Sequence, residues 1–178
     1  IECSIGMVHQ HFMLVPSLTV AENVVLGVEP HKGIKFDKKE AIRRTNEIAE
    51  KYNLPIPAEA KVEDISVGMK QRVEIIKALL KGAEILILDE PTRGIDVGAT
   101  EFIRKKLVEL SRSGIAVLLV SADLNEVMEL SDSLIVMQGG HIAAYFEDTK
   151  ALTDDQMGEY MLGLKQQSAD QIRRVCHD

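Results

Sequence analysis

The stretch ILILDEPT, residues 85–92, is an apolar run that stops abruptly at two adjacent carboxylates. Its four apolar residues, 85–88, predict a strand buried on both faces of a parallel sheet. Such a strand delivers Asp89 and Glu90 to the carboxyl edge of the sheet, where ligands of open α/β folds bind. One carboxylate could hold Mg²⁺ and the other could orient or deprotonate an attacking water. The plain alternative is a strand end with solvated acids.

Strands and helices alternate on both sides of this run. Apolar segments at 5–8 and 115–121 predict two more strands, the second of them also buried, and Gly-Gly at 139–140 predicts the turn of a hairpin. Helices are predicted from apolar periodicity and end signals at 18–27, 37–54, 99–114, 125–130 and 153–164. The segment 65–82 is predicted to start with a turn of small residues and to continue as a helix. Alternation of this kind is typical of an α/β fold with a parallel sheet.

Two helix starts carry more detailed expectations. Asp37 is a candidate N-cap with Glu40 three residues on, which is the spacing of a capping box. Thr153 and Gln156 have the same spacing before the last predicted helix. In the helix predicted at 18–27, we expect the side chain of Leu26 to point inward with its apolar neighbours.

ISVGMKQR, residues 65–72, is a second candidate for binding chemistry. Ser66 and Gly68 lie immediately before a predicted helix, so backbone N–H groups and the positive helix end could face an anion. A simple N-cap is the alternative for such a turn. The turn lies about twenty residues before ILILDEPT, and this placement makes it a more specific signal for binding chemistry than a Ser-x-Gly turn alone.

Composition narrows the class of protein. A chain of 178 residues that is 46% hydrophobic fits one globular domain, and its net charge of -7 argues against a primary nucleic-acid binder. Cys3 and Cys176 lie at opposite ends in no metal-like spacing, which indicates a reducing, cytoplasmic setting. No apolar run approaches the length of a membrane span. Because the chain opens on Ile1 within an apolar segment, we expect a missing beginning.

Four segments in this order and spacing resemble the nucleotide-binding subunit of ABC transporters: VHQHF, ISVGMKQR, ILILDEPT and GIDVGAT. VHQHFMLVPSLTVAENVVLG and LLVSADLNEVMELSD further resemble the branch that serves importers of simple sugars and nucleosides. The resemblance implies an α/β, P-loop NTPase-type ATPase domain over residues 1–164, incomplete at its N-terminus, followed by a polar tail at 165–178.

The resemblance also implies roles for single residues. Gln10 would be the Q-loop glutamine, which touches Mg²⁺ and the attacking water. Asp89 would be the Walker B aspartate that binds the metal, and Glu90 the catalytic carboxylate. Asp96 would be the D-loop aspartate at the contact between two ATPase domains. The signature turn, which clamps the γ-phosphate of ATP held by the opposite domain, would consist of Ser66, Val67, Gly68 and Met69.

ATP and Mg²⁺ are the cofactors that this resemblance implies. The implied partners are transmembrane permease subunits, a second ABC ATPase domain and, indirectly, a solute-binding protein, with no nucleic acid. The implied location is peripheral, on the cytoplasmic face of the cell membrane. Two alternatives stay open: a non-catalytic ABC half that supplies only its signature turn, and a soluble ABC ATPase of DNA repair or translation.

The sequence departs from the family pattern in two places. No G-x-x-x-x-G-K-[ST] occurs in it, so the Walker A strand and loop that cradle the phosphates are absent. Ala122 stands where the family has a histidine that contacts the γ-phosphate. In this importer branch two ATPase domains often lie in one polypeptide, and the second domain resembles this chain at SADL, residues 121–124. We therefore expect a junction of first- and second-domain segments near residues 89–93.

Overall fold

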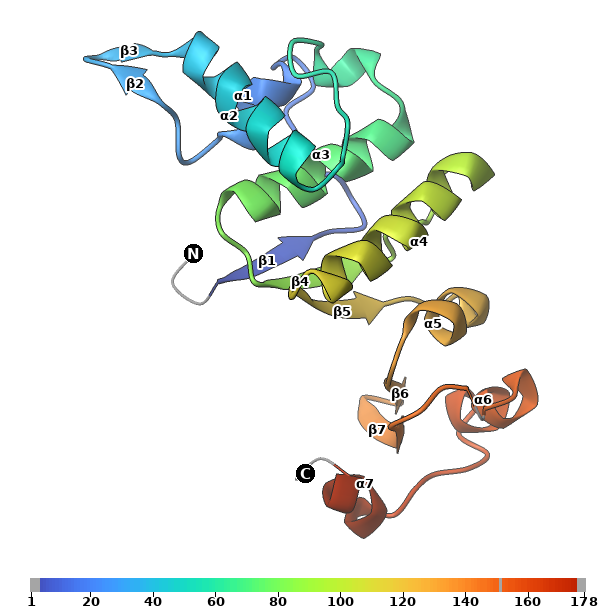
Figure 1. Ribbon diagram of the computed structural model, residues 1–178. Coiled ribbons are helices and arrows are strands. Elements are labelled where there is room, and N and C mark those ends of the chain that lie inside the picture. Colours follow the sequence, from blue (N-terminus) through green and yellow to red (C-terminus); the bar gives the residue numbers. More distant parts are fainter. Residues whose placement is uncertain (1–3, 151, 176–178) are drawn as a thin grey trace. The chain divides into compact units, whose positions relative to one another are not determined.

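The computed structural model describes residues 4–150 and 152–175, and it divides into two compact units. The first unit ends at Ser121 and the second begins at Ala122 (Figure 1). Each unit has its own sheet and helices, and they are taken in turn below.

A three-stranded parallel sheet forms the centre of the first unit. Its strands are β1 (Ile5–Val8), β4 (Ile85–Asp89) and β5 (Ala116–Val120), in the order β1-β4-β5. In the register, Val8 lies opposite Leu88 and Asp89 lies opposite Val120. The predicted strands and the parallel α/β sheet are therefore confirmed.

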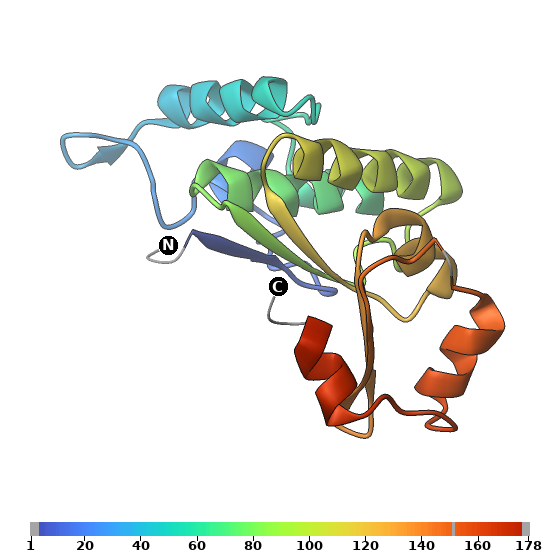
Figure 2. The same cartoon turned by 60° about the horizontal axis from the view of Figure 1, so that its bottom comes forward.

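Only one face of this sheet is well covered within the described residues. The helices α3 (Val67–Leu80) and α4 (Val97–Arg112) lie over it, as Figure 2 shows, and bury Leu86 and Leu88. Side chains that alternate with these point to the other face, where Leu118 is 52% exposed and Val120 is 49% exposed. The expectation that β4 and β5 are buried on both faces is wrong, because helices of this unit pack on one side.

The remaining elements of the first unit lie between β1 and β4 in the sequence. They are α1 (Val20–Val24), the hairpin of β2 (His31–Lys32) and β3 (Lys35–Phe36), α2 (Lys38–Lys51) and the short 3₁₀ helix Val62–Asp64. Thr19 caps α1, and Glu22 completes a capping box. This helix is shorter than predicted, and Leu26 lies beyond its end with 39% of its surface exposed, so the inward placement of Leu26 is wrong.

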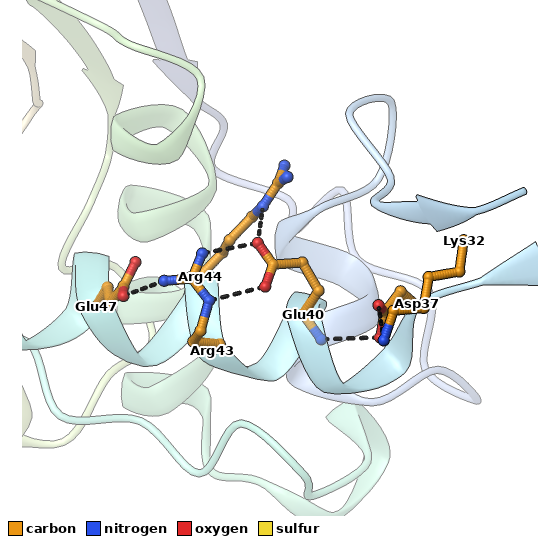
Figure 3. A network of polar contacts seen from close by, with 6 residues as sticks. All are labelled: Lys32, Asp37, Glu40, Arg43, Arg44 and Glu47. Atoms are coloured by element: carbon orange, nitrogen blue, oxygen red, sulfur yellow. Dashed lines mark hydrogen bonds and ion pairs between the residues drawn. The ribbon is translucent and has the colours of Figure 1, made fainter.

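Asp37 caps α2 by accepting a hydrogen bond from the Glu40 N–H at 3.2 Å, as predicted. The second half of the expected capping box is absent from the described contacts of Glu40, because its side chain turns to Arg43 and Arg44 instead (Figure 3). Arg43 Nη2 and Arg44 Nε donate to Glu40 Oε1 at 2.7 and 2.9 Å. Arg43 also pairs with Glu47.

These contacts predict a pH dependence of stability. The hydrogen bonds from Arg43 and then Arg44 lower the pKa of Glu40 from 4.5 to about 2. Because the folded pKa is depressed, the stabilisation is present above pH 4.5 and is lost as the pH falls toward 2. We expect Glu40→Gln to lower the thermal midpoint at pH 7, and this difference from the wild type to shrink across that window. Glu50→Gln, exposed on the same helix, is the control, and a constant difference for Glu40→Gln would contradict the prediction.

In the second unit, residues 122–150 and 152–175 form a two-stranded antiparallel sheet and three helices. Its elements are α5 (Leu124–Leu130), β6 (Leu134–Gln138), β7 (His141–Phe146), α6 (Asp154–Met161) and α7 (Ala169–Val175). Gly139 and Gly140 form the predicted turn with φ of +57° and +80°, values that favour glycine. Thr153 and Gln156 form the predicted capping box of α6.

The second unit has a small core of its own. Val136, Ala144 and Met157 are buried together between the hairpin and α6, and the rings of Phe146 and Tyr160 meet edge to face at 5.4 Å. Within the segment predicted as a polar tail, the Gln167 side chain exchanges two hydrogen bonds with the backbone of Tyr145. Gln167 therefore lies beside β7.

Candidate functional site

The carboxyl edge of the first sheet gathers three of the predicted site residues. Gln10 lies just beyond the end of β1, and Asp89 ends β4 with Glu90 directly after it. Since β1 and β4 are parallel and Val8 lies opposite Leu88, these residues leave the sheet at the same edge. All three side chains are half-buried. The structure thus brings together an amide and two carboxylates where α/β folds bind ligands.

The backbone of Glu90 has a conformation that is uncommon for a residue with a side chain. Its φ is +49°, in the left-handed region. The Glu90 N–H donates to the Val120 carbonyl at 2.8 Å, and its own carbonyl accepts from the Arg93 N–H at 3.2 Å. These two bonds hold the sharp turn that ends β4. Residues kept in such conformations concentrate at functional sites.

The signature turn lies at the start of α3. Ser66 is the N-cap, and its hydroxyl accepts a hydrogen bond from the Met69 N–H at 3.3 Å. Ser66 and Val67 are exposed, Met69 is half-buried and Gly68 is buried. The first N–H groups of a helix have no partner within it and carry positive partial charge, so this exposed turn can receive an anion.

The turn that carries Asp96 lies against the signature turn. Asp96 caps α4 and accepts a hydrogen bond from the Ala99 N–H at 2.9 Å. A Cβ placed on Gly68 would lie 2.6 Å from the Ala99 Cβ and 3.5 Å from Ile95 Cγ2. The starts of α3 and α4 are therefore packed as closely as a glycine permits. Sequence reasoning missed Ala99, because nothing in its spacing marks a packing contact.

A second contact fixes α3 against α4. The Arg72 guanidinium lies 3.8 Å from the centre of the Phe102 ring, and Arg72 Nη1 donates to the Pro55 carbonyl at 3.4 Å. Burial lowers the pKa of Arg72. Arg72 is one helical turn after Gly68, so the close packing of the two helices continues beyond their first turns.

The segment that follows Gln10 is held by side chains from two helices. Asn23 of α1, which is buried, accepts from the Val15 N–H at 2.7 Å and donates to the Val15 carbonyl at 3.1 Å. In α3, Glu74 accepts a hydrogen bond from the Met13 N–H, and Lys77 donates one to the Met13 carbonyl. Sequence reasoning missed Asn23, Glu74 and Lys77. Glu74 could have been noticed, because a glutamate among the apolar residues 73–76 is unusual.

Ala122 opens the second unit, directly before the N-cap of α5. That cap is Asp123, whose carboxylate accepts from the N–H groups of Asn125 and Glu126 at 3.0 and 3.3 Å. The described contacts explain Asp123 as a capping residue. The role of position 122 stays a prediction from the sequence.

The donor set at the sheet edge suits Mg²⁺. This ion prefers oxygen ligands and commonly uses one or two carboxylates of the protein, with waters and phosphate oxygens completing its shell. Asp89 and Gln10 offer such oxygens at adjacent strand ends. Among the residues described, no group of three or more His, Cys, Asp and Glu could hold a metal by itself.

In the same part of the chain, no helix is long and apolar enough to cross a membrane.

A family model described as "ABC transporter" matches residues 1–93, more than half of the sequence. The chain belongs to the ABC transporter family. The predicted resemblance to this family is thereby confirmed, and the predicted α/β ATPase fold with it. The roles of the individual site residues stay predictions.

Several curated relatives of this ABC chain are import proteins. The nucleoside import ATP-binding protein NupA of Lactococcus lactis is 40% identical over 162 residues, covering 89% of this chain and 31% of NupA. The guanosine import ATP-binding protein NupO of Bacillus subtilis is 41% identical, covering 91% of this chain and 32% of NupO. The chain thus spans about a third of the length of these relatives.

A solved ABC structure shares the fold. It is the dimer of the ATP-binding cassette MJ0796 in a post-hydrolysis state with ADP and phosphate. The two chains are 26% identical and superpose with a TM-score of 0.64, over 83% of this chain and 64% of the other.

Proposed function

We propose that this chain is part of the ATP-hydrolysing component of an ABC importer for simple sugars or nucleosides. The observation that carries the proposal is the meeting of Gln10, Asp89 and Glu90 at one edge of the parallel sheet. An ABC family match and import relatives at about 40% identity support the same assignment. The reaction would be hydrolysis of ATP coupled to uptake of the solute.

Each group at the sheet edge has a distinct task in this proposal. Asp89 and Gln10 would hold Mg²⁺, which neutralises charge on the phosphates when it is bound. Glu90 would orient the attacking water and accept its proton, since the turn described above fixes its backbone at the strand end. Positioning and charge stabilisation of this kind supply most of the catalysis in phosphoryl transfer.

The signature turn would act on a second ATPase domain. Ser66, Val67, Gly68 and Met69 would present the positive end of α3 to the γ-phosphate of ATP bound by the opposite domain. Asp96 would lie at the same contact, because its turn packs against Gly68. The dimeric state of the related cassette MJ0796 supports a two-domain arrangement.

The remaining partners follow from the importer assignment. ATP hydrolysis would drive the transmembrane permease subunits, and a solute-binding protein would deliver the solute to them. The chain would lie at the cytoplasmic face of the membrane, attached through the permease. We retain the expectation that it has no nucleic-acid partner, which rests on its net charge of -7.

A non-catalytic ABC half is the second candidate function. One observation favours it: the methyl side chain of Ala122 can neither donate a hydrogen bond to a phosphate nor transfer a proton. Such a half would supply only the signature turn to a partner that holds ATP. In that case the protein would raise the ATP turnover of its partner without turning over ATP itself.

We also propose the junction of first- and second-domain segments near residues 89–93. LDEPT suits both domains of a tandem ABC protein, so an in-frame join there preserves the motif. Sequencing the native gene across codons 85–100 tests this. A single uninterrupted domain that carries a P-loop upstream and the same sequence at 85–100 would overturn the junction.

Co-purification tests the proposed function. We expect the full native protein, produced together with the membrane-protein genes beside its own, to be recovered with integral membrane subunits and to hydrolyse ATP in that complex. A soluble ABC ATPase would hydrolyse ATP and recover no membrane subunit. Recovery of membrane subunits without any turnover would favour the non-catalytic half.

A further inference from the structure

A closed ring of polar contacts joins α3 to the segment that follows Gln10. The Met13 N–H donates to Glu74 Oε1 at 2.5 Å, and Lys77 Nζ donates to the Met13 carbonyl at 2.8 Å. Lys77 Nζ also lies 3.4 Å from Glu74 Oε2. Two side chains one helical turn apart thus hold both polar backbone groups of one residue. We call the set Met13, Glu74 and Lys77 the Met13 clamp.

The two charged side chains of the Met13 clamp are mostly shielded from water, whereas Met13 itself is 64% exposed. Glu74 is only 4% exposed, and a carboxylate buried to that degree is tolerated when partners satisfy it. Its partners here are the backbone N–H of Met13 and the ammonium group of Lys77. The contacts join residues 61 and 64 positions apart in the sequence, so they exist only in the folded chain.

The clamp and the sheet together bracket Gln10. On one side, Val8 is fixed by its place opposite Leu88 in the sheet. On the other side, Met13 is fixed by the clamp, and the four residues 9–12 lie between these two anchors. Without the clamp, the next anchor along the chain is Val15, which Asn23 holds. A longer tether gives Gln10 more freedom to leave the sheet edge.

We propose that Glu74 and Lys77 are positioning residues for Gln10. They fix the loop that carries Gln10 relative to Asp89 and Glu90, and they tie it to the helix whose first turn is the signature turn. Neither residue is assigned a contact with the nucleotide or the water. The inference rests on the proposed function, because it assumes that Gln10 takes part in ATP hydrolysis.

Lys77→Met in the full native protein tests the clamp. We expect kcat for ATP to fall by about 10- to 100-fold, with little change in KM, because a displaced loop misplaces Gln10 more than it weakens binding. Hydrogen exchange of the peptide containing Met13 should become faster. Lys77→Arg keeps a donor at this position and should restore most of kcat. Lys81→Met, at the end of the same helix, is the matched control and should leave both measurements unchanged.

A double-mutant cycle with Gln10→Ala shows whether the effect passes through Gln10. If it does, Lys77→Met causes no further loss of kcat once Gln10 is gone. Additive losses would overturn the proposal, and so would unchanged kcat and unchanged exchange in Lys77→Met. Should Lys77→Met fail to fold, Glu74→Gln replaces it, since glutamine can still accept from the Met13 N–H but no longer attracts Lys77.

The same cycle separates this proposal from the proposed function. If Gln10→Ala alone leaves turnover unchanged, the role given to Gln10 in hydrolysis is wrong, and the proposal of positioning falls with it. If Gln10→Ala lowers turnover but Lys77→Met does not, the proposed function stands and only the clamp is overturned.

Discussion

Replacing Glu90 by glutamine in the full native protein is expected to lower the rate of ATP hydrolysis by about 10²- to 10⁴-fold, the usual contribution of a general base. Glutamine has nearly the same shape and can still accept a hydrogen bond, but it cannot take a proton from water. ATP binding should be retained, because Glu90 is not expected to hold the phosphates. Measured ATP turnover and nucleotide affinity together test this.

Glu84→Gln is the matched control for Glu90→Gln. Glu84 is exposed directly before β4, at the opposite end of the strand that delivers Glu90. The control should hydrolyse ATP at the wild-type rate. Equal turnover by Glu90→Gln and the wild type would show that Glu90 is not the base. The thermal midpoint of Glu90→Gln distinguishes a loss of folding from a loss of catalysis. We expect this midpoint to differ little from that of the wild type.

Gly68→Ala is expected to destabilise the first unit by about 1–3 kcal/mol, the usual cost of adding a methyl group to a tightly packed site. The new Cβ would lie 2.6 Å from the Ala99 Cβ, closer than two methyl groups can approach. Neither atom is at the end of a flexible side chain, so α3 and α4 must move apart. The free energy of unfolding, measured by denaturant titration, tests this.

Two further variants separate packing from helix propensity. Gly98 is the second residue of α4, as Gly68 is of α3, and a Cβ placed on it would meet its nearest atom at an ordinary 3.5 Å. Gly98→Ala should therefore leave stability unchanged or raise it by up to about 1 kcal/mol. Combining Gly68→Ala with Ala99→Gly should recover part of the loss. No recovery would mean that the cost of Gly68→Ala lies elsewhere.

Much of this fold was predictable because the signals are local. The caps at Asp37 and Thr153 and the turn at Gly139 and Gly140 depend on residues at most three positions apart. The strands were found from short apolar runs. The burial of their side chains was not predictable, since an apolar run shows only that both faces of a strand can be covered. Leu118 and Val120 suit a buried strand as well as the half-exposed one observed.

The candidate site divides in the same way. The order of its motifs predicted the family, which the family match confirms, and the resemblance implied roles for Gln10, Asp89 and Glu90 that stay predictions. The sequence had no means to show that Gly68 packs on Ala99, or that Arg72 lies on the Phe102 ring. Those contacts depend on how two helices cross, which the periodicity of either helix leaves open.

By itself, then, the sequence determined the strands of the parallel sheet, the helices α2 to α6, the caps at Asp37 and Thr153 and the strand ends that carry the carboxylates, but not β2, β3 or α7. The tertiary structure decided which face of the sheet is covered, why position 68 is glycine, and what fastens the loop after Gln10. The physical reason is separation along the chain. Caps and strand alternation are set by neighbouring residues, whereas Glu74 reaches Met13 across 61 positions only after the sheet and α3 have formed.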